Sequence, residues 1–356
     1  MSFDPNAAAS PESGLFGLDC TDDEARVVIL PVPFDATTSY GKGSARGPEA
    51  ILEASKQVDL YDLETGRPYE AGIALYGWPR KSAASLRTWN REATRFAQPV
   101  IAAAGVVGSD RKLQSALAQV NELSEKVNAL VRSEVDTLIR RGKIVGLLGG
   151  DHATPFGSIE AHARAYPGMG VLHIDAHADL RRAFEGFVWS HASIMFNVVE
   201  RLPGVKRLVQ VGIRDFCEEE LEVIKGSRGR VVTHFDLELA RGREGGTPWL
   251  KQCSHIVKEL PEEVYVSFDI DGLDPALCPH TGTPVPGGLS FNQACLLIGE
   301  VVRSGRRIVG FDLNEVAPGP KGDEWDANVG ARILYKLLGW ALVGAERPRA
   351  KGRKRK

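Results

Sequence analysis

The sequence predicts an α/β fold in which helices cover both faces of one wide, parallel sheet. Short runs rich in Val, Ile and Leu alternate with helical stretches along its 356 residues, and several runs are apolar almost throughout. Strands buried on both faces have this character, and alternating strands and helices are typical of βαβ units with parallel strands. The length would allow about two domains, but no Pro/Ser linker or internal repeat marks a boundary. We therefore expect a single α/β domain.

Eight segments are predicted to be strands, and each is short, apolar and rich in β-branched residues. They are Val27–Val32, Ile73–Tyr76, Ile144–Leu148, Gly170–Ile174, Arg207–Val211, Val231–Phe235, Val264–Phe268 and Ile308–Leu313. Eight parallel strands can form an open sheet or a closed TIM barrel, so their number does not choose between the two.

Three segments are predicted to be helices, at Leu113–Arg140, Ser290–Arg303 and Trp325–Val343. In the first, apolar residues recur every three or four positions and charged residues fill the other side. This spacing gives one apolar face, which we expect to pack on the core. The preceding stretch Trp78–Asp110 has no readable pattern.

Composition excludes several classes of protein. With 43% apolar and 25% charged residues the chain is typical of globular proteins, and no apolar run approaches the roughly 18 residues of a membrane span. The segment Met1–Ser13 lacks the basic-then-apolar order of a signal peptide. The five cysteines are scattered and form no CxxC pair, so we expect reduced thiols in a cytoplasmic protein.

The formal net charge of −2 hides an uneven distribution. Arg347–Lys356 holds seven basic residues and no acid, whereas the rest of the chain has 37 basic and 46 acidic residues. A basic tail suggests a function of a different class, binding to nucleic acid or an anionic surface. No aromatic residue accompanies the basic ones to stack on bases, so we expect no nucleic-acid partner.

Acids and histidines gather where three predicted strands end. The segments are Gly149-Gly150-Asp151-His152, Asp175-Ala176-His177-Ala178-Asp179 and Asp269-Ile270-Asp271-Gly272-Leu273-Asp274-Pro275. Ligands of parallel sheets bind beyond the carboxyl ends of the strands, and residues two apart at a strand end share a face. The three loops are therefore predicted to converge.

Together these loops would bring four carboxylates and two imidazoles into one pocket. The residues are His152, Asp175, His177, Asp179, Asp269 and Asp271. So much negative charge is unfavourable without cations, and mixed Asp and His ligands without cysteine suit a divalent ion such as Mn²⁺. Six ligands are more than one catalytic ion usually takes, which indicates two ions. Any one of these histidines alone would fit a helix cap or a core residue instead.

The three segments resemble the signature motifs of the ureohydrolases, the family of arginase, agmatinase, other guanidino-acid hydrolases and formiminoglutamase. The resemblance runs from about Val27 to Leu342 and includes Pro33-Phe34-Asp35, Gly47-Pro48-Glu49-Ala50-Ile51 and the loop Gly282–Leu289. It implies a three-layer αβα sandwich around an eight-stranded parallel sheet rather than a barrel. It also implies a homotrimer or homohexamer.

On this resemblance we expect an N-terminal extension at 1–25 and a ureohydrolase domain at 26–344. The domain would contain a helical insertion at about 78–140, and a basic tail would follow at 345–356. A zinc deacetylase shares the general fold, but the Gly-Gly-Asp-His motif and Glu315 argue against it.

The resemblance also implies how two manganese ions are held. One ion would be bound by His152, Asp175, Asp179 and Asp269. The other would be bound by Asp175, His177, Asp269 and Asp271, so that Asp175 and Asp269 bridge the pair.

The resemblance further assigns residues to catalysis and substrate binding. Asp179 would accept a proton from the water that attacks the guanidinium carbon. His191 matches the mobile proton-shuttle histidine of the family, a role that suits the pKa range of imidazole; the alternative is a helix N-terminal residue without chemistry. Glu315 matches the carboxylate that receives the planar guanidinium cation.

The segment after Asp179 decides the substrate in this family. Arginases have a Ser-Gly-Asn element there that grips the α-carboxylate, whereas Leu180–His191 is similar to agmatinase-type sequences, and so is the early acid Asp35. We therefore expect hydrolysis of agmatine to putrescine and urea. Val285 and Pro286 stand where many agmatinases have an acid. Arginine, guanidino acids, formiminoglutamate and free guanidine therefore remain alternatives, the last with Ni²⁺ as the metal.

Overall fold

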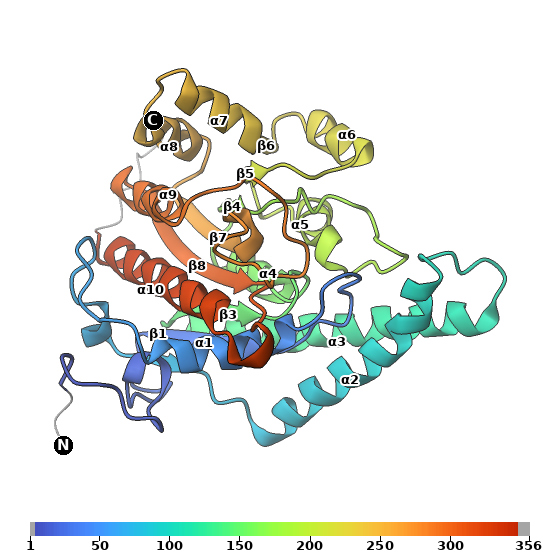
Figure 1. The fold of residues 1–356 in the computed structure, drawn as a ribbon, viewed down its shortest axis with the longest axis horizontal. Coiled ribbons are helices and arrows are strands. Elements are labelled where there is room, and N and C mark those ends of the chain that lie inside the picture. Colours follow the sequence, from blue (N-terminus) through green and yellow to red (C-terminus); the bar gives the residue numbers. More distant parts are fainter. Residues whose placement is uncertain (1–3, 348–356) are drawn as a thin grey trace, which may run out of the picture.

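The computed structural model describes residues 4–347, which form three layers around one eight-stranded sheet (Figure 1). Every pair of neighbouring strands is parallel, in the order β2-β1-β3-β8-β7-β4-β5-β6. The strands are β1 Val27–Val32, β2 Ile73–Leu75, β3 Ile144–Gly149, β4 Gly170–Ile174, β5 Arg207–Ile213, β6 Val231–Phe235, β7 Glu263–Asp269 and β8 Arg307–Asn314. The open order, with β2 and β6 at the edges, confirms the predicted sandwich and excludes the barrel.

Helices cover the two faces of the sheet. The first cover is built from α1 Gly47–Ser55, α7 Asp236–Glu244, α8 Trp249–Lys258, α9 Phe291–Arg303 and α10 Trp325–Glu346. The opposite cover is built from α2 Arg80–Ala102, α3 Arg111–Arg140, α4 Phe156–Ala165, α5 Ile194–Arg201 and α6 Glu218–Gly226. In the part of the chain that is described, no helix combines the length and apolarity needed to cross a membrane.

The side chains of β1 point alternately to the two faces of the sheet, which shows why the strands are apolar throughout. Val27 and Ile29 pack into the core under α1 and α10, whereas Val28, Leu30 and Val32 pack into the core under α2 and α3. Successive side chains of a strand point to opposite faces, so a central strand with helices on both sides needs apolar residues at every position.

The predicted elements differ from the observed ones mainly at their ends. β7 and β8 extend to Asp269 and Asn314, which pair in register, because polar residues at a strand's end still join the backbone ladder. β5 continues past a bulge to Ile213. The basic tail from position 348 onward lies outside the described residues.

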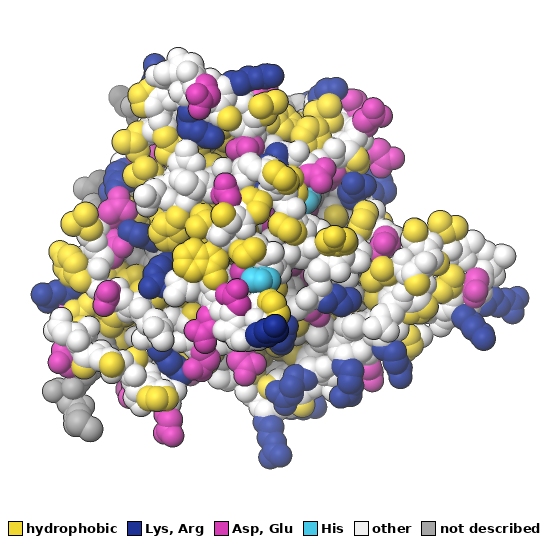
Figure 2. Space-filling view, in the orientation of Figure 1, with side chains coloured by type: hydrophobic (Ala, Val, Ile, Leu, Met, Phe, Trp, Pro, Cys, Tyr) yellow, Lys and Arg dark blue, Asp and Glu magenta, His cyan; other side chains and the backbone are white. Residues whose placement is uncertain are grey.

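The stretch without a readable pattern, Trp78–Asp110, contains the long helix α2. Together α2 and α3 form an antiparallel hairpin whose tip, residues 103–110, projects from the body of the molecule (Figure 1). The lower edge of the molecule in Figure 2, where α2 lies, is rich in basic side chains. Exposed basic residues of α2 include Arg80, Arg87, Arg91 and Arg95.

Candidate metal centre and substrate pocket

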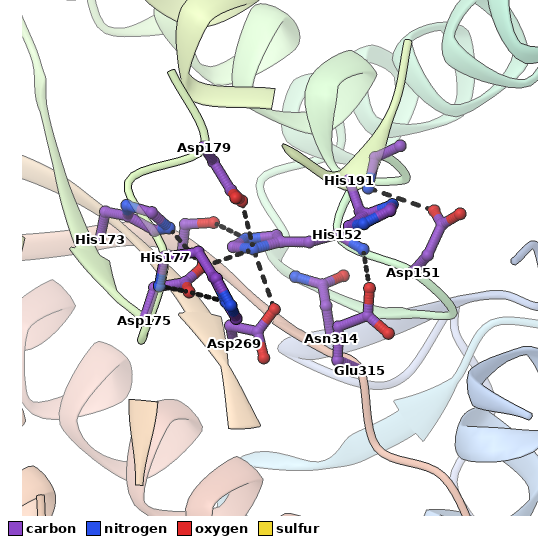
Figure 3. Close-up of polar contacts among 12 residues, drawn as sticks. Asp151, His152, His173, Asp175, His177, Asp179, His191, Asp269, Asn314 and Glu315 are labelled. Atoms are coloured by element: carbon purple, nitrogen blue, oxygen red, sulfur yellow. Dashed lines mark hydrogen bonds and ion pairs between the residues drawn. The ribbon is translucent and has the colours of Figure 1, made fainter. Parts of the chain in front are cut away.

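The three motif loops converge at the carboxyl ends of the four central strands, as predicted (Figure 3). β3 leads to His152, β4 leads to Asp175, and β7 ends at Asp269. β8 lies between β3 and β7 and contributes Glu315 from just beyond its end. Adjacent parallel strands thus bring to one place residues that are up to 163 positions apart in the chain.

Three carboxylates surround one ring nitrogen of His152. Its Nδ1 lies 3.0 Å from Asp175 Oδ2, 3.3 Å from Asp179 Oδ2 and 3.2 Å from Asp269 Oδ2. All four side chains are at most 5% exposed. An imidazole Nδ1 carries at most one proton, so it cannot satisfy three carboxylates. This donor set fits a divalent cation bound among these atoms.

A second group of ligand atoms lies beside the first. His177 Nδ1 is 3.0 Å from Asp271 Oδ2 and 3.5 Å from Asp175 Oδ1. Asp175 therefore turns one oxygen to each group, the arrangement expected of a bridging ligand. Asp269 turns only Oδ2 toward the first group, since its Oδ1 accepts a hydrogen bond of 2.9 Å from the backbone of Asp271.

The pKa values of Asp269, Asp179 and His177 are raised because several carboxylates are buried close together. Burial, with the charges of Asp271 and Asp175, raises the pKa of Asp269 well above its ordinary value. Burial and Asp175 raise the pKa of Asp179 to about 7. Burial opposes the charge of His177, yet Asp271 and Asp175 raise its pKa to about 12. Divalent cations supply the positive charge that these shifts call for.

His173 joins the cluster although it was not among the predicted ligands. Its Nε2 lies 2.8 Å from Asp175 Oδ2, and its Nδ1 accepts a 3.0 Å hydrogen bond from Gln210. Gln210 in turn accepts from Thr233. His173 is therefore placed either to orient Asp175 or to ligate an ion itself. His173 stands two positions before Asp175 but inside the predicted strand Gly170–Ile174, where the sequence alone does not distinguish a ligand from a core residue.

A pocket of about 180 Å³ opens beside the cluster. Residues from several loops line it: Ser39, His177, Asp179, Arg181, Phe184, His191, Ala192, Asp215, Phe216, Glu220 and Thr283. Both His177 and Asp179 belong to the cluster, so a molecule in this pocket touches the candidate metal centre directly.

His191 stands in this pocket with a free ring nitrogen. Its backbone N–H donates to Thr37 Oγ1 at 3.3 Å, while its Nδ1 is buried without a hydrogen-bond partner. Burial, with the positive charges of His177 and His152, lowers the pKa of His191 to about 4. The edge of its ring meets Phe184, with 5.8 Å between ring centroids. A neutral imidazole with a free nitrogen can take up or give a proton.

Glu315 is buried next to the cluster and keeps one oxygen free. Its Oε1 accepts a 2.9 Å hydrogen bond from the backbone of His152, but Oε2 has no partner. Burial, with the charge of Asp151, raises the pKa of Glu315 well above its ordinary value. Its φ of 61° is uncommon for a residue other than glycine, and strained backbone of this kind often marks functional positions. A free, buried carboxylate oxygen is suited to receive a cation.

Asp35, the early acid of the sequence, is not among the residues that line the pocket. Its Oδ2 accepts from the backbone of Gly43 and Ala45 at 3.2 and 3.3 Å, and its Oδ1 accepts from Asn90 at 3.3 Å. Asp35 therefore orders its own loop, which also carries the pocket residue Ser39.

Comparison with known proteins shows the family to which the chain belongs. The family model described as the arginase family matches residues 25–339. An N(1)-aminopropylagmatine ureohydrolase of Thermus thermophilus is 35% identical over 90% of this chain and 92% of its own. An agmatinase of Bacillus subtilis is 28% identical over 89% and 92%. The crystal structure of the agmatine ureohydrolase of Thermoplasma volcanium superposes with a TM-score of 0.68 at 25% identity, covering 96% of both chains. The chain therefore belongs to the arginase family.

Proposed function

We propose that this chain hydrolyses agmatine, or agmatine lengthened by an aminopropyl group, to urea and an amine, with two Mn²⁺ ions. As a member of its family the chain is a hydrolase of guanidino C–N bonds that releases urea. Relatives named for agmatine and for N(1)-aminopropylagmatine support both substrates. The oxygen and nitrogen donors, without sulfur, support manganese.

The observation that carries the substrate proposal is the position of Phe184. Where an arginase would grip an α-carboxylate, this chain presents the aromatic ring of Phe184 to the pocket, beside His191. An aromatic wall suits the methylene chain of agmatine. The carboxylates of Asp215 and Glu220 also line the pocket and favour a substrate whose far end is a cation.

The residues around the cluster divide the chemistry among them. Divalent ions held by the His and Asp ligands of the cluster would supply Lewis acidity, which lowers the pKa of water toward neutrality and makes it a nucleophile for the guanidinium carbon. Glu315 Oε2 receives the guanidinium and fixes its plane. Asp179 Oδ2 would accept a proton of the water, and the free Nδ1 of the neutral His191 would take up that proton and pass it to the leaving amine.

One observation favours a second candidate substrate class. Arg181 also lines the pocket, and its only ion-pair partner among the described residues, Glu220, is 3.8 Å away. A guanidinium there could bind the carboxylate of a guanidino acid, so guanidinobutyrate and guanidinopropionate belong in the test.

A panel of substrates tests the proposal. We expect urea release from agmatine or N(1)-aminopropylagmatine with Mn²⁺ to exceed that from arginine, guanidinobutyrate, guanidinopropionate and free guanidine. Formiminoglutamate would release formamide instead of urea and is followed separately. Preference for a guanidino acid would replace the substrate proposal, and activity on guanidine alone with Ni²⁺ would replace the metal as well.

The metal ligands are tested by substitution. We expect Asp175→Ala or Asp269→Ala to lower both the metal content and turnover, because each removes a carboxylate next to His152. Metal analysis by mass spectrometry and urea assays measure this, with the exposed Asp274→Ala as the control. Retention of both metal and turnover would refute the binuclear site.

Two further expectations of the sequence, the oligomer and its place in the cell, stay proposals, and the alternative of a different class is tested alongside them. We propose a homotrimer or homohexamer in the cytoplasm, which light scattering and fractionation would check. Binding of nucleic acid through the tail, which lies outside the described residues, is tested by deleting 348–356. Unchanged retention of nucleic acid after the deletion would reject that function.

A further inference from the structure

The turn at the centre of the loop that walls the substrate pocket is anchored in the α2–α3 hairpin. This loop, residues 181–190, connects Asp179 to His191 and places Arg181 and Phe184 in the pocket. At its far side Phe187 is fully buried, in a small apolar cluster of its own. The buried members of that cluster besides Phe187 are Ala97 and Val100 of α2 and Ala116 and Val120 of α3.

Phe187 is tied to Phe184 by a tight turn. The backbone N–H of Phe187 donates to the carbonyl of Phe184 at 2.8 Å, and the reverse bond measures 3.2 Å. The two residues between them, Glu185 and Gly186, have φ of 52° and 84°, as in a type I′ turn. Positive φ at Glu185 is unfavourable for a residue other than glycine or asparagine. The turn therefore depends on contacts outside itself.

Those contacts come from the hairpin. Asn121 of α3 accepts from the Val188 N–H at 2.9 Å and donates to the Gly186 carbonyl at 3.4 Å, so it grips the backbone on both sides of Phe187. Gly105 in the hairpin tip packs on the turn, since a Cβ there would lie 2.5 Å from the Glu185 Cα.

The same hairpin holds the loop on the other side of the pocket. Asn90 of α2 accepts from the backbone N–H of Asp35 at 3.0 Å and donates to its carboxylate at 3.3 Å. The loop of Asp35 carries Ser39 of the pocket wall and Thr37, which accepts from the backbone of His191. One projecting element thus contacts both loops, and each of them contributes residues to the pocket lining.

From this arrangement we propose that the α2–α3 hairpin sets the length selectivity for the guanidino substrate, with Phe187 as its positioning residue. Phe187 does not line the pocket. It acts by fixing the turn that holds Phe184 against the substrate chain and against His191. The inference rests on the proposed function for its substrates, but the anchoring of the loop is independent of it.

The test compares Phe187→Ala with the wild type on α,ω-guanidinoalkylamines that differ by one methylene. A one-methylene difference in an apolar pocket is worth about 10-fold or more, and we expect Phe187→Ala to lower this discrimination by about 3- to 10-fold. KM should rise by about 10-fold with kcat within about 3-fold, since binding and not chemistry is affected. Metal content should equal that of the wild type.

Two variants serve as controls. Leu138→Ala removes a buried side chain of α3 at a point where this helix packs on the sheet. This variant should lower the stability of the protein but leave KM and selectivity unchanged. Glu185→Asn creates the Asn-Gly pair preferred by type I′ turns. Added to Phe187→Ala, it should restore part of the selectivity.

Hydrogen exchange separates the failure of this inference from failure of the proposed function. We expect the amides of 184–188 to exchange faster in Phe187→Ala and at the wild-type rate in Leu138→Ala, whatever the substrate. Unchanged exchange would overturn the anchoring role. Faster exchange with unchanged selectivity and KM would overturn the role in specificity. A wild type that hydrolyses no guanidino compound, with exchange as expected, would refute the proposed function alone.

Discussion

His152 uses its two ring nitrogens differently. Nδ1 faces the three carboxylates, while Nε2 lies 2.9 Å from Ser267 Oγ, which in turn donates to Asp312 Oδ1 at 2.9 Å. Because the Ser267 hydroxyl gives its proton to Asp312, it accepts one from Nε2. The lone pair then stays on Nδ1, where a metal ion would need it.

Removal of this support should weaken the binding of metal. We expect Ser267→Ala to lower metal affinity by about 10- to 100-fold, the usual effect of losing a hydrogen bond to a ligating histidine. Competition with a chelating dye measures this, and Ser254→Ala in α8, whose hydroxyl donates to the Leu250 carbonyl, is the control. Equal affinity in both variants would show that Ser267 does not orient His152.

A second buried histidine, His162, predicts a pH dependence of stability. Its Nδ1 donates to the Ser158 carbonyl at 2.8 Å, its Nε2 has no partner, and burial lowers its pKa from 6.5 to about 4. The unfolded chain therefore takes up this proton at a higher pH than the folded chain. The stabilising contribution is complete above pH 6.5 and is lost as the pH falls toward 4.

Denaturant unfolding at several pH values tests this effect. A shift of about 2.5 pKa units corresponds to about 3 kcal/mol. Between pH 6.5 and 4 the free energy of unfolding of the wild type should therefore fall by up to this amount more than that of His162→Gln, which lacks the titrating group. Parallel curves for the two proteins would contradict the neutral, buried state of His162.

At this scale the sequence predicts the ligands better than their supports. Asp175, His177 and Asp179 are recognisable because they cluster in five positions at a strand's end. Ser267 and Asp312 lie inside β7 and β8, where a polar residue looks like any other strand position. Their roles depend on which strands are neighbours, and periodicity along one strand carries no such information.

At the scale of elements, α2 and α3 show what periodicity detects. The buried face of α3 is rich in Val and Leu, so its spacing is visible, whereas the buried face of α2 is Leu86, Ala93, Ala97 and Val100. Alanine is small and favoured at any position of a helix, so the face of α2 does not stand out. Small residues there let the two helices approach and leave room for Phe187.

The start of α3 depends on a cap that can be tested. Asp110 accepts from the backbone N–H groups of Lys112 and Leu113 at 2.8 and 3.2 Å. We expect Asp110→Ala to lower the free energy of unfolding by about 1 kcal/mol, the typical value of an N-cap. Urea unfolding followed by circular dichroism measures it. The exposed neighbour Ser109→Ala should change little, and an equal loss in both variants would reject the cap.

At the scale of the whole molecule, the acidic cluster couples metal binding to stability. Asp175, Asp179, Asp269 and Asp271 are buried together, and mutual repulsion opposes folding unless cations balance it. A ligand present at about 100 times its Kd stabilises the folded state by about 2.7 kcal/mol. We therefore expect a chelator to lower the melting temperature and Mn²⁺ to restore it. A melting curve insensitive to the chelator would contradict the site.

The place of β8 in the sheet has a consequence for the order of assembly on the ribosome. β8 is the last strand among residues 4–347, yet it lies between β3 and β7 and joins the group β2-β1-β3 to the group β7-β4-β5-β6. His152 belongs to the first group, Asp175 and Asp269 to the second. Until Arg307–Asn314 has emerged from the ribosomal tunnel, a nascent chain has two half-sheets and no shared ligand cage. Metal binding that uses His152 together with Asp175 and Asp269 would therefore have to wait until β8 joins the two groups of strands.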